Sequence, residues 1–181
     1  MSSSITLAFL KIQGGTAFFQ GFIDKITGKY RHVEIIFTEK EGNFYACSIN
    51  KITPVYYTKR TFGAPGWEYV RISGLSTEDV AKMDNFCFTE SKKSCIFDEA
   101  GMFRSASPLP RTARERSWFC SELVGAALQE GGLLKDLNPS AMTPEAIYNN
   151  IYKTVPPCNI TKITTPLFSS EFVREKNISI L

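Results

Sequence analysis

The stretch SWFCSELVGAALQ, residues 117–129, decides how this chain of 181 residues is interpreted. Apolar residues recur along it at helical spacing and two glycines follow it, which predicts a helix over residues 118–129. We expect Ser117 to cap this helix, so that Cys120 lies in its first turn. Amides there are unpaired and lie at the positive end of the helix dipole, where they stabilise a thiolate. Cys120 is therefore a candidate nucleophile and its backbone amide a candidate oxyanion donor, although most free cysteines are small buried hydrophobic residues.

The partner of such a cysteine is restricted by composition, because His32 is the one histidine in the chain. It opens a predicted strand, residues 32–38, whose alternate apolar residues form a core face. His32 and Glu34 share the other face, about 7 Å apart along the strand. A lone strand histidine is more often structural, and the adjacent carboxylate favours a base. Candidates for the group that orients the imidazole are Glu34 and, depending on hairpin register, Ser48 or Asn50.

The remaining periodicities predict a mixed α+β fold in one domain, residues 1–181 with a core over about 5–168. We expect a mostly antiparallel sheet or small barrel with helices packed on it. Further strands are predicted at residues 4–11, 43–49, 55–57, 68–72 and 160–168, helices at 16–26, from Ser76 and from Thr143, and a loop over 98–116. The strands 32–38 and 43–49 are predicted to form a hairpin.

Composition excludes several classes of function. The net charge of +3, from 21 Lys+Arg and 18 Asp+Glu, comes without a basic stripe, so we expect no nucleic-acid partner. The five cysteines form no CxxC pair, so we expect neither disulfides nor a metal site, and no cofactor. No basic region precedes the N-terminal apolar run, and no segment reaches roughly 18 apolar residues. We expect a cytoplasmic protein without a transmembrane segment; the oligomeric state stays open.

The run WFCSELV, residues 118–124, closely resembles the nucleophile motif of the YaeF/YiiX-like branch of permuted NlpC-type papain-like proteins. HVEI at residues 32–35 is similar to the histidine motif of that branch, in which the histidine strand precedes the cysteine helix. Three further segments agree in order with this family: residues 67–76, 96–98 and 142–145. The similarity spans roughly residues 5–152. It implies a circularly permuted papain-like fold with the nucleophile at a helix N-terminus.

The resemblance also implies thiol chemistry at an amide, ester or thioester carbonyl through an acyl-enzyme, as in a cysteine peptidase or amidase. Many members carry an acidic residue in the strand after the histidine, where this chain has YACS at residues 45–48. We therefore expect Glu34 to act as the third catalytic group, with Ser48 as second choice. The expected substrate is a peptide, an amide or an acyl lipid.

Two other interpretations stay open. One is a lipid-acting thiol acyltransferase or phospholipase, with peripheral membrane contact and with aromatic-rich loops at residues 56–57 and 62–67 that hold an apolar substrate. The other is a binding module that keeps the fold without catalysis. Compact members of the family also occur in large DNA viruses, in which case the location is the host cytoplasm.

Overall fold

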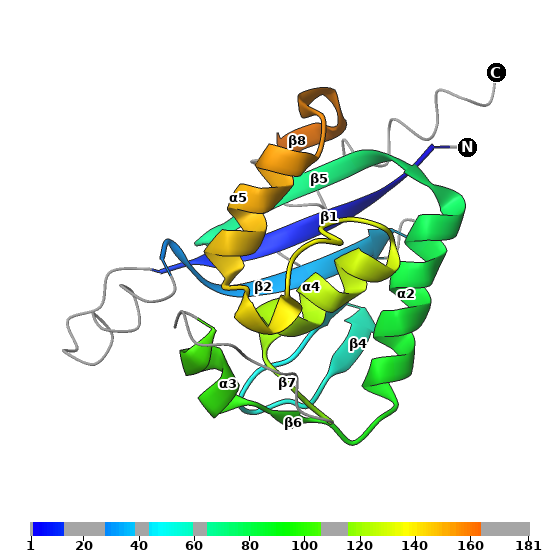
Figure 1. The fold of residues 1–181 in the computed structure, drawn as a ribbon. Coiled ribbons are helices and arrows are strands. Elements are labelled where there is room, and N and C mark those ends of the chain that lie inside the picture. Colours follow the sequence, from blue (N-terminus) through cyan, green and yellow to red (C-terminus); the bar gives the residue numbers. More distant parts are fainter. Residues whose placement is uncertain (1, 13–27, 39–43, 60–64, 106–115, 164–181) are drawn as a thin grey trace.

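A computed structural model describes residues 2–12, 28–38, 44–59, 65–105 and 116–163, in which one six-stranded sheet is the framework (Figure 1). Its strand order is β4-β3-β2-β1-β5-β8 and all neighbouring strands are antiparallel. The strands are β1 (Ser2–Lys11), β2 (Tyr30–Thr38), β3 (Phe44–Ser48), β4 (Tyr56–Lys59), β5 (Trp67–Ser76) and β8 (Ile160–Ile163). Within the described residues β4 and β8 are the two edge strands and do not pair with each other, so the sheet is not a closed barrel and that expectation is wrong, whereas the mixed α+β class with an antiparallel sheet is confirmed.

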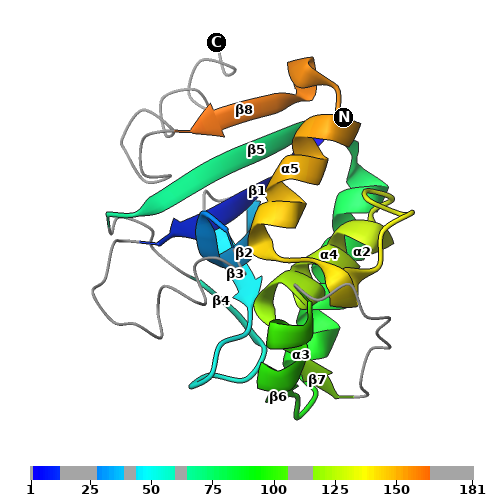
Figure 2. The same ribbon diagram turned by 60° about the vertical axis from the view of Figure 1, so that its left-hand side comes forward.

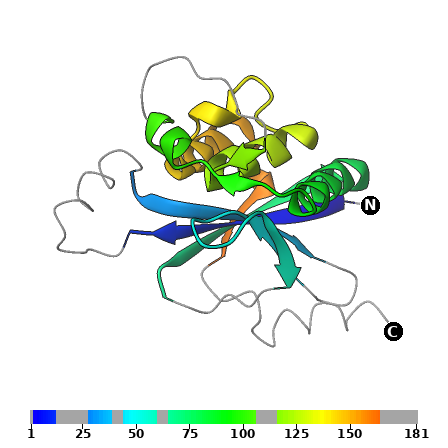
Figure 3. The same cartoon turned by 90° about the horizontal axis from the view of Figure 1, so that it is seen from below.

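Four α-helices of the described residues cover one face of this sheet (Figures 2 and 3). They are α2 (Thr77–Ser91), α3 (Glu99–Arg104), α4 (Cys120–Glu130) and α5 (Pro144–Thr154). Two short 3-10 turns, η1 (Pro139–Ala141) and η2 (Pro157–Asn159), flank α5, and a parallel pair, β6 (Ile96–Phe97) with β7 (Ser117–Trp118), lies below α4 in Figure 1. None of the described helices has the length and apolar character needed to cross a membrane.

Strand alternation explains where the core lies. On β2, Val33, Ile35 and Phe37 belong to the main apolar cluster, which also holds the inner residues of α4. Ile36 belongs to a smaller cluster on the opposite face, together with Ala8 of β1. Both faces of the central strands are therefore buried, and the predicted core face of β2 is the one that meets the helices.

The predicted hairpin is confirmed, with Ile35 opposite Cys47 in the β2–β3 register. The predicted helix starts at Ser76 and Thr143 are also confirmed. The Ser76 hydroxyl accepts from the amide of Asp79 at 3.0 Å, and the Thr143 hydroxyl accepts from the amide of Ala146 at 3.1 Å. These caps were predictable because the hydroxyl and the amide it accepts from lie within one helical turn.

Two predictions about the segment before Cys120 are wrong. The loop expected over 98–116 contains α3, which begins because the carboxylate of Asp98 accepts from the amide of Gly101 at 2.7 Å. Ser117 does not cap α4, because residues 117–118 form β7 against β6 and the N-cap is Phe119. The helix expected at 16–26 and the end of the last strand beyond residue 163 lie outside the described residues.

Candidate active site

The candidate active site lies at the edge of β2, just past the point where β3 pairs with it. The β2–β3 pairing starts at Ile35, so the backbone of Val33 faces other partners. The hydroxyl of Ser48 donates to the Val33 carbonyl oxygen at 2.7 Å, and the Val33 backbone also hydrogen-bonds the sulfur of Cys120. The backbone of Val33 thus contacts both the end of β3 and the first residue of α4.

His32 lies one residue before this contact and points its imidazole into the same region. Its Nε2 is 3.5 Å from Oε1 of Glu34 and 3.4 Å from the hydroxyl oxygen of Tyr56. The ring of Trp67 approaches edge-on, with ring centroids 6.2 Å apart. The side chain of His32 is 16% exposed and that of Glu34 is fully buried. The imidazole is thus held by buried groups on one side and still open to solvent on another.

The charges of Cys120 and His32 stabilise each other. Burial alone lowers the pKa of His32, but the charge of Cys120, a hydrogen bond with it, and the hydrogen bond and charge of Glu34 together raise that pKa to about 9. Burial alone raises the pKa of Cys120, but the charge and hydrogen bond of His32 and two backbone hydrogen bonds lower it below the ordinary thiol value. Both shifts favour a thiolate beside an imidazolium.

The N-terminus of α4 also stabilises negative charge at the site. Cys120 is the first residue of α4, and the preceding N-cap, Phe119, has no side-chain acceptor to offer the first-turn amides. The backbone of Ser121 hydrogen-bonds the Cys120 sulfur and helps to lower its pKa. The amide of Cys120 lies at the same positive helix end, where a negative oxygen is stabilised.

Three of the residues singled out in the sequence thus come together: Cys120, His32 and Glu34. Ser48, the second choice for the third group, binds the Val33 carbonyl and so positions the strand rather than the imidazole. The side chain of Asn50 accepts from the amides of residues 52 and 53 and closes a turn.

Sequence reasoning missed the contacts of Tyr56 and Trp67 with the imidazole. Tyr56 lies opposite Ser48 in the β3–β4 register, and Trp67 lies opposite Leu10 in the β1–β5 register. Both contacts with His32 depend on strand register between distant segments, for which the sequence carries no local signal.

Buried carboxylates fix the backbone on both sides of Cys120. Glu90 of α2 is 6% exposed and accepts from Nε1 of Trp118 at 3.0 Å. Glu122 of α4 is almost fully buried and accepts from the hydroxyl of Ser140 in η1. The nucleophile candidate therefore lies between two anchored positions, each two residues away.

Comparisons of the chain with family models, with curated proteins and with solved structures give no match. The chemistry of the site is therefore argued from its own residues.

Proposed function

We propose that this protein is a cysteine hydrolase of the peptidase or amidase class, with Cys120 as nucleophile and His32 as general base and acid. One observation carries the proposal: the chain's one histidine meets the cysteine at the start of α4, and each shifts the pKa of the other toward the ion pair. A structural cysteine in an apolar core shows the opposite shift, because burial raises its pKa.

The reaction has two stages. The Cys120 thiolate attacks the carbonyl carbon of an amide, and the amide of Cys120 donates to the oxyanion that forms. The imidazolium of His32 gives its proton to the leaving amine as the carbon–nitrogen bond breaks, which leaves a thioester on Cys120. Neutral His32 then takes a proton from water while the hydroxide attacks the thioester. Collapse of the tetrahedral intermediate then releases the carboxylic acid and expels the Cys120 thiolate, while His32 keeps the proton it took from water, which restores the thiolate–imidazolium pair.

Glu34 is the proposed third group. Its carboxylate and the hydroxyl of Tyr56 both lie beside Nε2 of His32. We infer that Nδ1 is then the nitrogen that serves Cys120, because a ring nitrogen held by a carboxylate keeps its proton. The buried negative charge of Glu34 also helps to raise the pKa of His32.

The proposed fold is the circularly permuted papain-like one. It is supported by a base on an early strand, a nucleophile that begins a later helix, and helices gathered on one face of an antiparallel sheet. The proposed location is the cytoplasm.

The second candidate function is a lipid-acting thiol acyltransferase or phospholipase. The aromatic rings of Tyr56 and Trp67 beside the imidazole favour it, since they border the base with apolar surface. The two functions share the acyl-enzyme and differ in the substrate and in the acceptor.

The test compares two cysteines of one protein. Alkylation by iodoacetamide is followed by mass spectrometry from acid to alkaline pH at Cys120 and at Cys158, which is free and exposed. We expect Cys120 to stay reactive well below neutral pH and to react there in preference to Cys158. The substitution His32→Ala should abolish the difference. Equal pH curves for both cysteines in the unsubstituted protein would refute the activated pair.

A further inference from the structure

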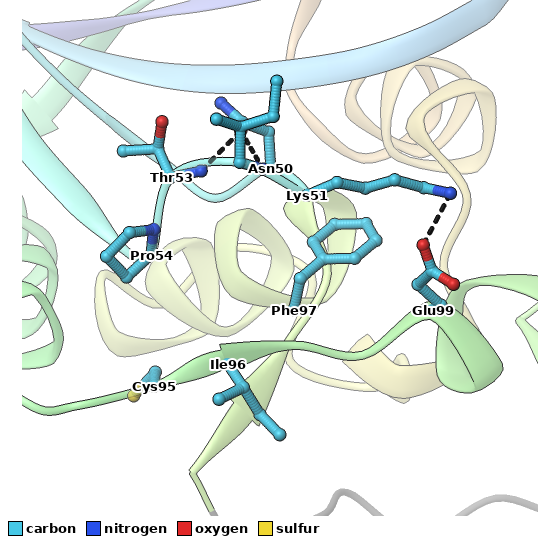
Figure 4. Close-up of a pocket in the computed structure, with 9 residues that line it drawn as sticks. Asn50, Lys51, Thr53, Pro54, Cys95, Ile96, Phe97 and Glu99 are labelled. Atoms are coloured by element: carbon cyan, nitrogen blue, oxygen red, sulfur yellow. Dashed lines mark hydrogen bonds and ion pairs between the residues drawn. The ribbon is translucent and has the colours of Figure 1, made fainter.

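A pocket of about 420 Å³ lies between the β3–β4 loop and the segment that contains β6 (Figure 4). The loop contributes Ile52 and Pro54, and the opposite wall contributes Ile96 and Phe97. This volume lies within the range of about 300–1,000 Å³ that is typical of sites for small ligands. The proposed mechanism leaves the pocket without a role.

Both walls of this pocket lie close along the chain to residues of the candidate active site. Pro54 lies two residues before Tyr56, whose hydroxyl contacts the imidazole. Phe97 lies opposite Trp118 in the β6–β7 register, and Trp118 lies two residues before Cys120. Two residues of extended chain span about 7 Å, which is the reach of a medium-sized side chain or a short acyl chain. A group attached to the carbonyl under attack could therefore extend into the pocket.

Exposed apolar side chains mark the rim. Ile52 is 95% exposed and Ile96 is 70% exposed, and they lie on opposite walls. Figure 4 shows the ring of Phe97 projecting between the two walls, whereas the side chain of Ile96 points away from the loop, as expected for neighbouring residues of a strand. Lys51 and Glu99 join the walls by an ion pair of 2.6 Å, drawn as a dashed line in Figure 4. Both side chains are more than half exposed, so the pair is screened by water and can open at little cost.

We propose that this pocket binds an apolar group on the acyl side of the scissile bond and thereby selects the substrate. The inference rests on the proposed function, because it assigns the specificity of the same acyl-enzyme. The acyl side is indicated because the β6–β7 pair leads into Cys120, which keeps the acyl part bound after the leaving group departs. The apolar group is either the hydrophobic side chain of a peptide or the alkyl chain of an acyl lipid.

The experiment measures kcat/KM with the full chain in two substrate series. Nitrophenyl esters lengthen from acetyl to decanoyl, and peptide nitroanilides carry Ala, Leu or Phe before the scissile bond. We expect at least one series to show a preference of about tenfold or more for the larger apolar group. A preference confined to esters assigns the pocket to an alkyl chain, and one confined to peptides assigns it to a side chain.

Variants at the rim test whether that preference depends on the pocket. Phe97→Ala and Ile52→Asp should reduce it at least fivefold without changing the rate for the smallest substrate, because Phe97 projects between the walls and Ile52 is exposed enough to preserve folding. Phe88→Asp is the matched control, because Phe88 is a large apolar residue of α2 that is 47% exposed and lies outside the pocket. A preference that is absent, or that the rim variants reduce no more than the control does, would overturn the pocket proposal alone. If mass spectrometry finds no acyl-Cys120 with any substrate, the proposed function fails as well.

Discussion

Two glutamates are buried on the sheet, Glu34 on β2 and Glu68 on β5, and their partners differ in kind. Glu68 is 2% exposed at its side chain and accepts from Nζ of Lys162 at 2.7 Å, from Nζ of Lys11 at 3.0 Å and from the Tyr148 hydroxyl at 2.9 Å. Nζ of Lys29 lies 3.3 Å away as well. Although burial opposes it, these donors hold the pKa of Glu68 well below its usual range.

Glu34 is equally buried, but the cation beside it is the imidazole of His32. A lysine ordinarily keeps its charge throughout the physiological range, so ion pairs with Glu68 of β5 hold β1, β8 and Lys29 together, and the hydrogen bond from Tyr148 adds α5. An imidazole ordinarily gains or loses its proton near neutral pH. A carboxylate beside it, such as Glu34 beside His32, therefore changes the pKa of a group that takes part in the proposed reaction. We therefore expect substitutions at Glu68 to change stability and substitutions around His32 to change activity.

The largest effect is expected from Cys120→Ala. It removes the sulfur that forms the acyl-enzyme, so turnover and covalent labelling by acyl substrates should be abolished, while the protein still folds. Cys158→Ala is the control, because that thiol is exposed and should contribute nothing to turnover. Turnover that survives Cys120→Ala would contradict the mechanism.

Glu34→Gln is expected to reduce kcat by roughly 10- to 1,000-fold, because the charge that orients His32 and favours its imidazolium is lost. The readout is direct, since the chain has one histidine and so one imidazole signal in proton NMR. That signal should titrate near pH 9 in the unsubstituted protein and at lower pH in the variant.

Glu68→Gln is the matched control for this titration and should leave the His32 signal where it was. A titration near pH 6.5, the ordinary histidine value, in the unsubstituted protein would contradict the ion pair.

Glu68→Gln should also lower the stability of the protein. Glu68→Gln leaves several lysines facing one another without their carboxylate, and we expect the free energy of unfolding to fall by about 2–3 kcal/mol. The figure lies below that of a fully buried pair because Lys11, Lys29 and Lys162 are each nearly half exposed. Urea unfolding at neutral pH measures the change, and kcat of the folded fraction should stay within about twofold. A loss of activity without a loss of stability would reverse the assignment of the two glutamates.

The two regions should also respond to pH in opposite directions. Because the pKa of His32 is raised to about 9, its contribution to stability is complete below the ordinary histidine value and is lost as the pH rises through 9. Because the pKa of Glu68 is lowered, its contribution is complete above the ordinary glutamate value and is lost on acidification. Differences in unfolding free energy from His32→Gln and Glu68→Gln, measured from acid to alkaline pH, should therefore shrink at opposite ends. Parallel curves would show that the two sites are not electrostatically distinct.

Local signals explain what the sequence predicted about these regions. Strand alternation was enough to place His32 beside Glu34, and the helix motif singled out Cys120. Ser117 was wrongly predicted to cap α4, because its pairing with Ile96 depends on a segment about twenty residues away. The Glu68 cluster was missed for the same reason, since its donors come from separate strands and from α5.

The smallest effect is expected where α2 supports the nucleophile segment. Trp118→Phe keeps an aromatic ring, although a smaller one, and removes the hydrogen bond from Nε1 to Glu90, at a cost of about 1 kcal/mol in unfolding free energy for the hydrogen bond. Because Trp118 lies in β7 and Cys120 begins α4, a small displacement should lower kcat by roughly twofold and leave the His32 titration unchanged. Glu90→Met removes the acceptor and so tests whether the hydrogen bond is responsible, and a cycle with the double variant should show coupling, since both single changes break one contact. Strictly additive losses would mean that Trp118 supports the site through packing against Phe86 rather than through Glu90.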